Sequence, residues 1–444
     1  MININVLDTN FNIVGVIDTY ESFIWTDRFK NYGDFELYSG VTSNLLNLCK
    51  QDYYLEIQES PHLMIIEGIE ISTDAESGNH LKITGRSLES IIDRRIIWDQ
   101  TTVSGTKDHT LKTAIEVLFK YCFGFGTKGT EITKKYTDMD GTQKRVPYIR
   151  STVRLTTNKN QTIDVRKERV IRDLLYLRPD EAMMDGITID KTQYTGDNLY
   201  DILMDIMDSY SSYGLGYRIV PLYKIKEIYT NDYISEHTDL TVEEVASLND
   251  YTFVFEIYTG VDRSYEQNIR PYIVFSPDFD NIINTSYLDT IEPYKNVTLI
   301  LGEGEGASRK RLILGGKDDN NQYVDPLIRR ELYTDARDIN MEDYGTTSNY
   351  KAALKQRGME SLYECTRDIT YDGEVEAERV FVYNEDFIMG DVVQISNEFG
   401  INGKARVIEY IISESNNGRE FYPTFDSVEL VNEFADEETG NPEE

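Results

Sequence analysis

The stretch YESFIWTDRFKNYGDFEL, residues 20–37, indicates the fold class more clearly than any other part of the chain. Its apolar run FIW at residues 23–25 leads into a polar turn, and the chain continues through FEL at residues 35–37. Strand alternation then places Phe35 and Leu37 on the same face. The stretch therefore predicts two β-strands joined by a turn, and it holds no plausible catalytic group.

A second stretch, YNEDFIMGDVVQIS at residues 383–396, has the same β character near the other end of the chain. Gly390 and Asp391 are typical of a turn, and the run VVQI that follows them predicts a short strand. Both ends of the chain are therefore expected to be β-rich.

Composition limits the classes of function. With 444 residues and 40% hydrophobic content, the chain can bury several cores. Lys and Arg number 45 against 78 Asp and Glu, a formal net charge of −33. This charge repels nucleic acid, so we expect no sequence-specific or groove-tracking DNA binding. Most of the carboxylates are expected to solvate the surface, and an acidic wall past which DNA slides is the alternative.

The cysteines and the first residues of the chain indicate the cellular compartment in which the protein is made. Cys49, Cys122 and Cys365 are odd in number and far apart, so they predict neither a disulfide framework nor a zinc site. The start, MININV, alternates like a strand and has no basic n-region, so no signal peptide is expected. Charges interrupt every apolar run before the roughly 20 residues that a bilayer requires. We expect synthesis in a reducing cytoplasm and no direct membrane span.

Periodicity predicts a β-rich, then mixed, then β-rich organisation of the chain. Four helices are expected: residues 87–98 starting at Ser87, residues 110–124 between Thr110 and Gly124, residues 197–214, and residues 346–365. Residues 123–187 are polar and mixed in charge, and they are interpreted as an insertion. Strands are expected at residues 2–7, 13–17, 23–25, 35–37, 54–58, 63–71, 80–84, 216–220, 251–259, 272–275, 282–287, 296–301, 366–371 and 375–382.

Several segments resemble motifs for binding phosphate, calcium or zinc, but each lacks residues that the motif requires. GEGEG at residues 302–306 lacks the Lys-Ser/Thr of a phosphate loop and presents two glutamates, so a hairpin or inter-subunit loop is favoured. DMDG at residues 138–141 lacks the closing glutamate of a calcium loop, and DDNN at 318–321 is common turn chemistry. The four histidines are scattered without a zinc-hydrolase spacing. No cofactor and no bound metal are therefore expected. The carboxylates are too numerous for any pair to single out a glycosidase.

The chain contains 32 tyrosines and only 2 tryptophans. Tyrosine provides large amphipathic contact area at low entropic cost, which suits interfaces, and β-propensity explains the same excess equally well.

Taken in order, several segments together resemble a family of siphophage tail proteins, similar to baseplate hub and tail-associated proteins of long-tailed phages. After residues 20–37, the segments are LMIIEGIEISTD (63–74), LKITGRSLESIIDRRIIWDQ (81–100), the helix at 197–216, RRELYTDARDI (329–339), YKAALKQRGMESL (350–362) and YNEDFIMGDVVQIS (383–396). The resemblance runs to about residue 435, and GRSLESIIDRRIIWDQ and ELYTDARDI are its most distinctive pieces.

The resemblance implies a β-rich α+β chain with two tube-type β-barrel domains flanking a mixed α+β middle. Three chains then present six similar units. The implied domains are residues 1–105 (first barrel with a packed helix), 106–195 (helix and insertion), 196–345 (mixed middle), 346–435 (helix and second barrel) and 436–444 (acidic tail). Candidate interface residues are Trp25, Phe35, Arg94, Arg95 and Trp98, and intrachain salt bridges or core packing are the alternative for the last three. Gly33, Gly85, Gly390 and Asp391 are expected to fix turns.

The function implied by the resemblance is that of a structural hub. A homotrimer at the distal tail tip or baseplate of a virion would close or ring the tail tube and open for DNA passage. Its expected partners are the distal tail ring protein, the tube or tape-measure protein and a tip or fibre protein. Two other classes stay open: a tail-associated cell-wall hydrolase, either peptidase or glycosidase, and a carbohydrate-binding tail module.

Overall fold

The computed structural model describes residues 1–74, 78–98, 101–103, 110–124, 130–132, 136–137, 143–144, 152–156, 162–166, 174–180, 183–184, 187, 189, 192–210, 213–317, 325–365, 367–374, 380–396, 402–427 and 436–437. The chain divides into two compact units. Unit 1 comprises Met1–Met204, Leu215–Ser286 and Asp372–Asp426, and unit 2 comprises Asp205–Gly214, Tyr287–Tyr371 and Ser427–Glu444. The calcium-loop motif at 138–141 and the DDNN motif lie outside the described residues, as does most of the expected insertion.

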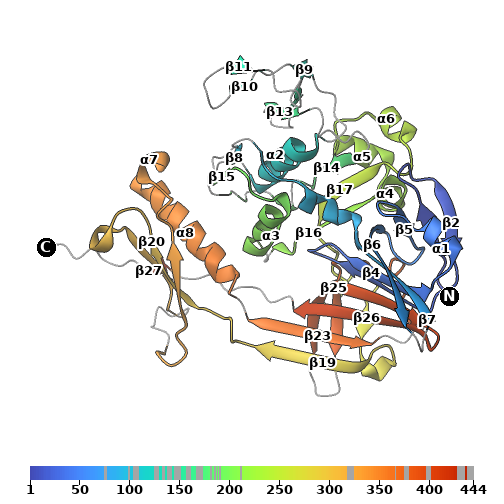
Figure 1. The fold of residues 1–444 in the computed structure, drawn as a ribbon. Coiled ribbons are helices and arrows are strands. Elements are labelled where there is room, and N and C mark those ends of the chain that lie inside the picture. Colours follow the sequence, from blue (N-terminus) through green and yellow to red (C-terminus); the bar gives the residue numbers. More distant parts are fainter. Residues whose placement is uncertain are drawn as a thin grey trace. The chain divides into compact units, whose positions relative to one another are not determined.

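A large, mainly antiparallel sheet dominates the fold (Figure 1). Along its path the strands follow the order β19-β23-β26-β25-β3-β4-β7-β6-β5-β1-β2, and β24 pairs with both β18 and β25. Their bounds are β1 Ile4–Leu7, β2 Ile13–Ile17, β3 Ser22–Arg28, β4 Asp34–Gly40, β5 Tyr54–Glu56, β6 Leu63–Asp74, β7 Gly78–Ser87, β18 Val274–Phe275, β19 Ile283–Thr290, β23 Asp368–Glu374, β24 Val392–Ser396, β25 Asn402–Ser415 and β26 Gly418–Ser427.

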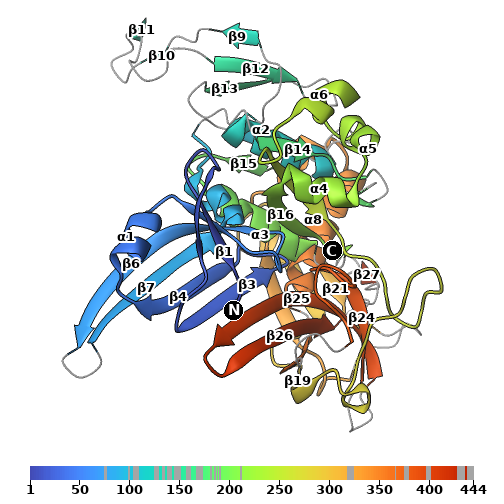
Figure 2. The same ribbon diagram turned by 90° about the vertical axis from the view of Figure 1, so that its right-hand side faces the viewer.

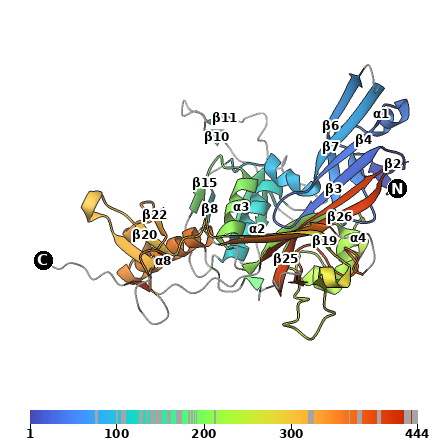
Figure 3. The same ribbon diagram turned by 90° about the horizontal axis from the view of Figure 1, so that it is seen from below.

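The two ends of the chain meet in this sheet. Strand β3 pairs on one side with β4, where Trp25 lies opposite Phe35, and on the other side with β25, where Trp25 lies opposite Ile412. The aromatic and aliphatic residues that alternate along β3 and β4 face inward, and Trp25 and Phe23 are fully buried. Figures 2 and 3 show the blue N-terminal strands side by side with the red β25 and β26.

A smaller sheet in unit 1 orders as β14 (Leu174–Leu177), β17 (Phe253–Tyr258) and β16 (Gly216–Pro221). Strand β17 pairs in parallel with β14 and antiparallel with β16. The ring of Phe119 on α2 (Leu111–Phe123) stacks on Phe255 of β17 with centroids 3.8 Å apart. Three short helices follow β16: α4 (Leu222–Ile228), α5 (Asn231–Glu236) and α6 (Val242–Ser247), and they pack against the sheet through a shared apolar core.

Unit 2 has its own core, built from a sheet ordered β22 (Glu331–Asp335), β20 (Val297–Leu301), β21 (Arg311–Gly315) and β27 (Asp436–Glu437). The long helix α8 (Thr347–Tyr363) runs along β20, as Figure 3 shows, and buries Leu354 and Leu362. Gly358 lets the helix approach closely, because a Cβ at this position would lie 2.3 Å from the Cδ1 of Ile300.

The remaining described elements are short. They are α1 Ser43–Leu48, the 3₁₀ helix Leu88–Arg94, β8 Thr101–Val103, β9 Thr130–Ile132, β10 Tyr136–Thr137, β11 Gln143–Lys144, β12 Thr152–Thr156, β13 Thr162–Arg166, β15 Thr192–Tyr194, α3 Leu199–Ser209, the 3₁₀ helices Pro277–Phe279 and Gly306–Ser308, and α7 Met341–Tyr344.

Most of the expected helices form where the sequence predicts them. The side chain of Thr110 caps α2, and Gly124 ends it in the left-handed conformation. The side chain of Thr346 caps α8, which agrees with the helix expected at residues 346–365. The predicted helix at residues 87–98 is wrong in type and length: only Leu88–Arg94 is helical, and it is a 3₁₀ helix. The GEGEG segment joins β20 and β21 as a hairpin, as favoured above.

Candidate functional site

The interior of unit 1 holds a group of buried ionisable side chains that includes Asp27 of β3. Asp27 of β3 is 1% exposed and accepts hydrogen bonds from Trp25 Nε1 at 2.9 Å, Ser60 Oγ at 2.8 Å and Tyr383 Oη at 3.0 Å. Nearby, Nδ1 of His62 lies 2.7 Å from Oε1 of Glu89. We call Asp27, His62 and Glu89 the buried triad.

The triad connects different parts of the sequence. Oε1 of Glu89 also accepts the main-chain N–H of Ile219 on β16 at 2.8 Å, so the 3₁₀ helix is fixed to the smaller sheet. Since a buried carboxylate must be paired and hydrogen-bonded to be tolerated, this arrangement fixes where β16 meets the large sheet.

Electrostatics within the triad oppose the effect of burial. Burial alone lowers the pKa of His62, but the carboxylates of Glu89 and Asp27 raise it to about 9. Burial raises the pKa of Glu89, yet the His62 cation outweighs this and holds the pKa below its ordinary value. The pKa of Asp27 is raised, chiefly by burial. A protonated His62 beside an ionised Glu89 is therefore the expected state near neutral pH.

A second buried ion pair lies on the smaller sheet. Arg218 donates from Nε to Oε2 of Glu256 at 2.9 Å, and its guanidinium lies 4.4 Å from the ring centroid of Tyr258. Tyr229 Oη donates to the other oxygen of Glu256 at 2.7 Å. Each charge in this pair is therefore matched inside unit 1.

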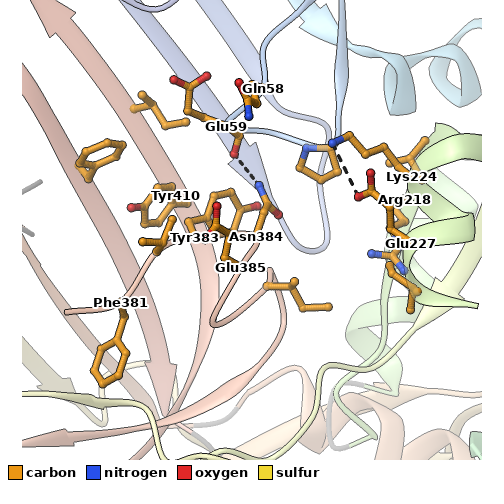
Figure 4. A pocket seen from close by; sticks show the side chains of 17 residues that line it. Gln58, Glu59, Arg218, Lys224, Glu227, Phe381, Tyr383, Asn384, Glu385 and Tyr410 are labelled. Atoms are coloured by element: carbon orange, nitrogen blue, oxygen red, sulfur yellow. Dashed lines mark hydrogen bonds and ion pairs between the residues drawn. The ribbon is translucent and has the colours of Figure 1, made fainter. Parts of the chain in front are cut away.

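Next to these pairs is a cavity of about 520 Å³, shown in Figure 4. Three segments form its walls: the β5–β6 connection, the β16–α4 segment, and the loop before β24 together with β25 and β26. In Figure 4 Tyr383, Asn384 and Glu385 lie on one side, and Arg218, Lys224 and Glu227 lie on the other. Asn384 donates to the main-chain oxygen of Glu59, so two of the walls are hydrogen-bonded to each other.

The cavity has a mixed lining of apolar, aromatic and charged side chains. Its apolar and aromatic residues are Pro61, Val220, Ile228, Phe381, Val382, Tyr383, Ile388, Tyr410, Ile412 and Phe421. Tyr383 and Tyr410 stack with centroids 4.3 Å apart and are nearly buried, so they present no open ring face for stacking a sugar. The carboxylates are Glu59, Glu227 and Glu385.

Most of the charged side chains that line the cavity are paired within the chain. Glu59 is paired with Arg419 at 3.2 Å, and Glu227 lies 3.8 Å from Lys224. Elsewhere in the chain, burial raises the pKa of Cys49 to about 12 and also raises that of Cys365, which lowers the reactivity of both thiols at neutral pH, and neither cysteine lines the cavity. Within the part of the chain that the structure describes, no group of His, Cys, Asp and Glu side chains could hold a metal ion.

Two of the expected interface residues belong to the interior. Trp25 is 0% exposed and Phe35 is 2% exposed in the single chain, so neither side chain has surface left to bury against another subunit. We correct that expectation: strand alternation turns both residues into the core of the large sheet.

The other interface candidates lie nearer the surface. Arg94 pairs with Glu67 at 2.9 Å, and the guanidinium of Arg95 lies 5.3 Å from the ring centroid of Phe123, so both make intrachain contacts. Trp98 is 54% exposed. Of the expected interface residues, Trp98 therefore offers the largest apolar side chain to a partner.

The expected turn residues have different roles. Gly390 adopts a φ of 89° in the turn before β24, as expected. Asp391 beside it is fully buried and accepts from the main-chain N–H of Val261 at 2.8 Å and from Arg263 Nε at 2.7 Å. Gly33 lies just before β4, and a Cβ there would lie 2.1 Å from the main-chain oxygen of Thr26. The close contact at Gly33 leaves no room for a Cβ, and the two hydrogen bonds at Asp391 require an acceptor side chain.

Gly85 was expected in a turn, and this is wrong. The residue lies inside β7 opposite Phe35 and next to the β-bulge of β6. A Cβ at Gly85 would lie 1.7 Å from the main-chain oxygen of Ile65, so glycine is required by the close approach of two backbones.

The sequence as a whole has a clear relation to known proteins. The family model described as Siphovirus ReqiPepy6 Gp37-like protein matches residues 3–425. The chain belongs to this family. The siphophage tail protein family expected from the sequence is thereby confirmed. No curated protein matches the chain in sequence.

Solved structures support the same fold for this Gp37-like chain. A tail protein from Neisseria meningitidis MC58 is similar with 12% identity, coverage of 96% of both chains and a TM-score of 0.51. The 43 kDa tail protein of prophage MuSo2 from Shewanella oneidensis is similar with 11% identity, coverage of 96% of this chain and 98% of that chain, and a TM-score of 0.51. At these identities the likeness concerns the fold, and it confirms the expected β-rich α+β class.

Family membership implies a place in the virion tail for the Gp37-like chain. None of the helices that the structure describes is long and apolar enough to cross a membrane.

Proposed function

We propose that this protein is the hub of a phage tail tip: a homotrimer that rings or closes the distal end of the tail tube and opens for DNA passage. One observation carries the proposal. Along the path of the large sheet, strands of the later part of the chain, in the order β19-β23-β26-β25, are followed directly by the N-terminal strands, in the order β3-β4-β7-β6-β5-β1-β2. Each chain thus contributes two sets of neighbouring strands, one from its N-terminal part and one from its later part.

Two sets of strands per chain would let a trimer present six similar walls around a channel. At the end of a tail, a tip with threefold symmetry must join a ring with sixfold symmetry. Six similar walls in a trimer would satisfy both. In this proposal the two sets correspond to the two tube-type barrel domains. The direct hydrogen bonding between β3 and β25 is the junction of the two walls within one subunit.

The partners of the hub follow from this position. We propose that one end of the ring contacts the distal tail ring protein or the tube, and that the other end contacts the tape-measure, tip or fibre protein. The net charge of −33 favours free passage of DNA, provided that enough of the carboxylates line the channel.

The mass of the purified protein in solution tests the proposal. One chain has a mass of 51.3 kDa, so a trimer has three times that value, about 154 kDa by light scattering. A stable monomer or a dimer at all accessible concentrations would contradict the trimer.

A further inference from the structure

The loop between β17 and β18 presents apolar side chains to solvent. Ile269 is 84% exposed, and the flanking Tyr265 and Tyr272 are 52% and 45% exposed. The two tyrosine rings meet edge to face with centroids 5.4 Å apart. In Figure 2 this yellow-green loop extends away from the strands of unit 1. We call residues 264–272 the apolar loop.

Hydrogen bonds hold the apolar loop in one conformation. Oε1 of Gln267 accepts the main-chain N–H groups of Ile269 at 2.8 Å and Arg270 at 2.7 Å. Nε2 of Gln267 donates to the main-chain oxygens of Arg270 at 3.0 Å and Ser264 at 3.3 Å. A loop that is ordered before binding loses little further entropy when it binds.

The base of the loop is tied to the large sheet. Arg263 pairs with the buried Asp391 at 2.7 Å, and Glu266 pairs with Lys404. Single exposed apolar residues are ordinary on protein surfaces, but here three of them share one fixed loop. Among the described residues, no carboxylate forms an ion pair with Arg270 at the tip. The loop therefore presents an apolar tip with an adjacent positive charge.

The cavity of unit 1 has the complementary character. Its lining combines apolar side chains with charged ones. Glu59 is paired with Arg419, Glu227 with Lys224 and Arg218 with Glu256. Among the described residues, no cation forms an ion pair with Glu385, so this carboxylate of the lining is the one available to a positive charge. A volume of about 520 Å³ lies within the range that proteins use for small ligands, so a few side chains of a loop can enter.

We propose that the apolar loop of one copy of this chain inserts into the cavity of a second copy, with Ile269 against the apolar side chains of the lining and Arg270 beside Glu385. This inference rests on the proposed function, because it supplies a contact between subunits of the hub. Loop and cavity are different surfaces of the chain, so the contact is heterologous and generates a ring when the rotation closes.

The charges of Arg270 and Glu385 favour the apolar loop of a second copy as the occupant of the cavity. Copies with a net charge of −33 repel one another, so a local contact between opposite charges favours their association. The pairing of Arg270 with Glu385 provides one. An anionic lipid surface would repel the same acidic chain.

Charge reversal tests the contact. We expect Arg270→Glu and Glu385→Arg each to raise the dissociation constant of the assembly at least about tenfold, because each places like charges together. The double variant restores the opposite charges and should return the dissociation constant to within about threefold of the wild-type value. Lys351→Glu, at an exposed position on α8, is the matched control and should leave the mass in solution unchanged.

The apolar half of the contact has its own control. Ile269→Asp should weaken association about 30-fold. Leu327→Asp changes a side chain that is 92% exposed on a different loop, and it should have no effect. If Leu327→Asp dissociates the assembly and Ile269→Asp does not, the inference is wrong.

Cross-linking separates this inference from the proposed function. In a Cys365→Ser background, Arg270→Cys protein is mixed with Glu385→Cys protein under mild oxidation. We expect a disulfide-linked pair that contains one copy of each. If wild-type trimers form but no such cross-link appears and Arg270→Glu leaves them intact, the inference fails and the hub stands. If the cross-link forms but the mass never reaches that of a trimer, the contact stands and the hub fails.

Discussion

The buried triad should make the stability of unit 1 depend on pH in a defined direction. His62 has an ordinary pKa of 6.5, which Glu89 and Asp27 raise to about 9 in the folded protein. Because the folded state binds the proton more tightly than the unfolded state, the stabilisation is fully present below about pH 6.5. It is lost progressively as the pH rises towards 9.

The magnitude follows from the same pKa values. A pKa difference of 1 corresponds to about 1.4 kcal/mol, so a rise from 6.5 to about 9 corresponds to about 3 kcal/mol of stability. Removing one partner of a buried ion pair costs roughly 3–5 kcal/mol, which is consistent with this value. Glu89→Gln should therefore destabilise unit 1 by about 3 kcal/mol at pH 6 and by less at pH 9.

The assay uses the buried Trp25, which donates to Asp27 and thus reports on the triad directly. In a Trp98→Phe background, Trp25 is the remaining tryptophan of the chain. Urea unfolding is followed by its fluorescence at pH 6 and at pH 9, for the protein with and without Glu89→Gln.

A matched control comes from the exposed ion pair of Lys82 with Glu36 at 2.7 Å. Glu36→Gln should leave the unfolding midpoint unchanged at both pH values. If the difference in unfolding free energy between the wild-type protein and Glu89→Gln is the same at pH 6 and at pH 9, the assignment of a protonated His62 is refuted.

Three further predictions concern packing and activity. Gly85→Ala should destabilise the protein by about 3 kcal/mol in urea unfolding, since its Cβ would lie 1.7 Å from a main-chain oxygen of β6. The control is Gly403→Ala, whose Cβ would have no atom within 4 Å and which should be tolerated. Equal destabilisation by the two variants would contradict the close approach. Asp391→Asn should cost about 3 kcal/mol, because an NH2 group replaces the carboxylate oxygen that accepts from Arg263 Nε and the negative charge is lost, and an unchanged midpoint would contradict its role. In a zymogram on cell-wall material we expect no cleared band, and a band abolished by a single carboxylate or cysteine substitution would favour the hydrolase instead.

Local patterns in the sequence predicted the elements well. Alternation around Trp25 and Phe35 correctly placed β3 and β4, and Thr110 and Gly124 correctly bounded α2. The 3₁₀ helix Leu88–Arg94 was assigned as a longer helix because its apolar spacing suits both types. Gly85 was misassigned because a glycine required by a neighbouring backbone looks the same in sequence as a glycine in a turn.

The site itself depends on contacts between residues far apart in the chain. His62 and Glu89 are separated by 27 residues, and Tyr383 and Asp27 by 356 residues, so no spacing rule connects them. The pairing of β3 with β25 is equally remote. The exposure of Ile269 could not be predicted either, because it depends on how Gln267 folds the loop. Such features require the tertiary structure.

Images of the purified protein viewed along its symmetry axis test the central claim most directly. Cryo-electron microscopy averages of a hub should show a closed ring with threefold symmetry, in which six similar walls surround a channel. A ring of three lobes without the paired walls, or particles that do not close around a channel, would contradict the hub.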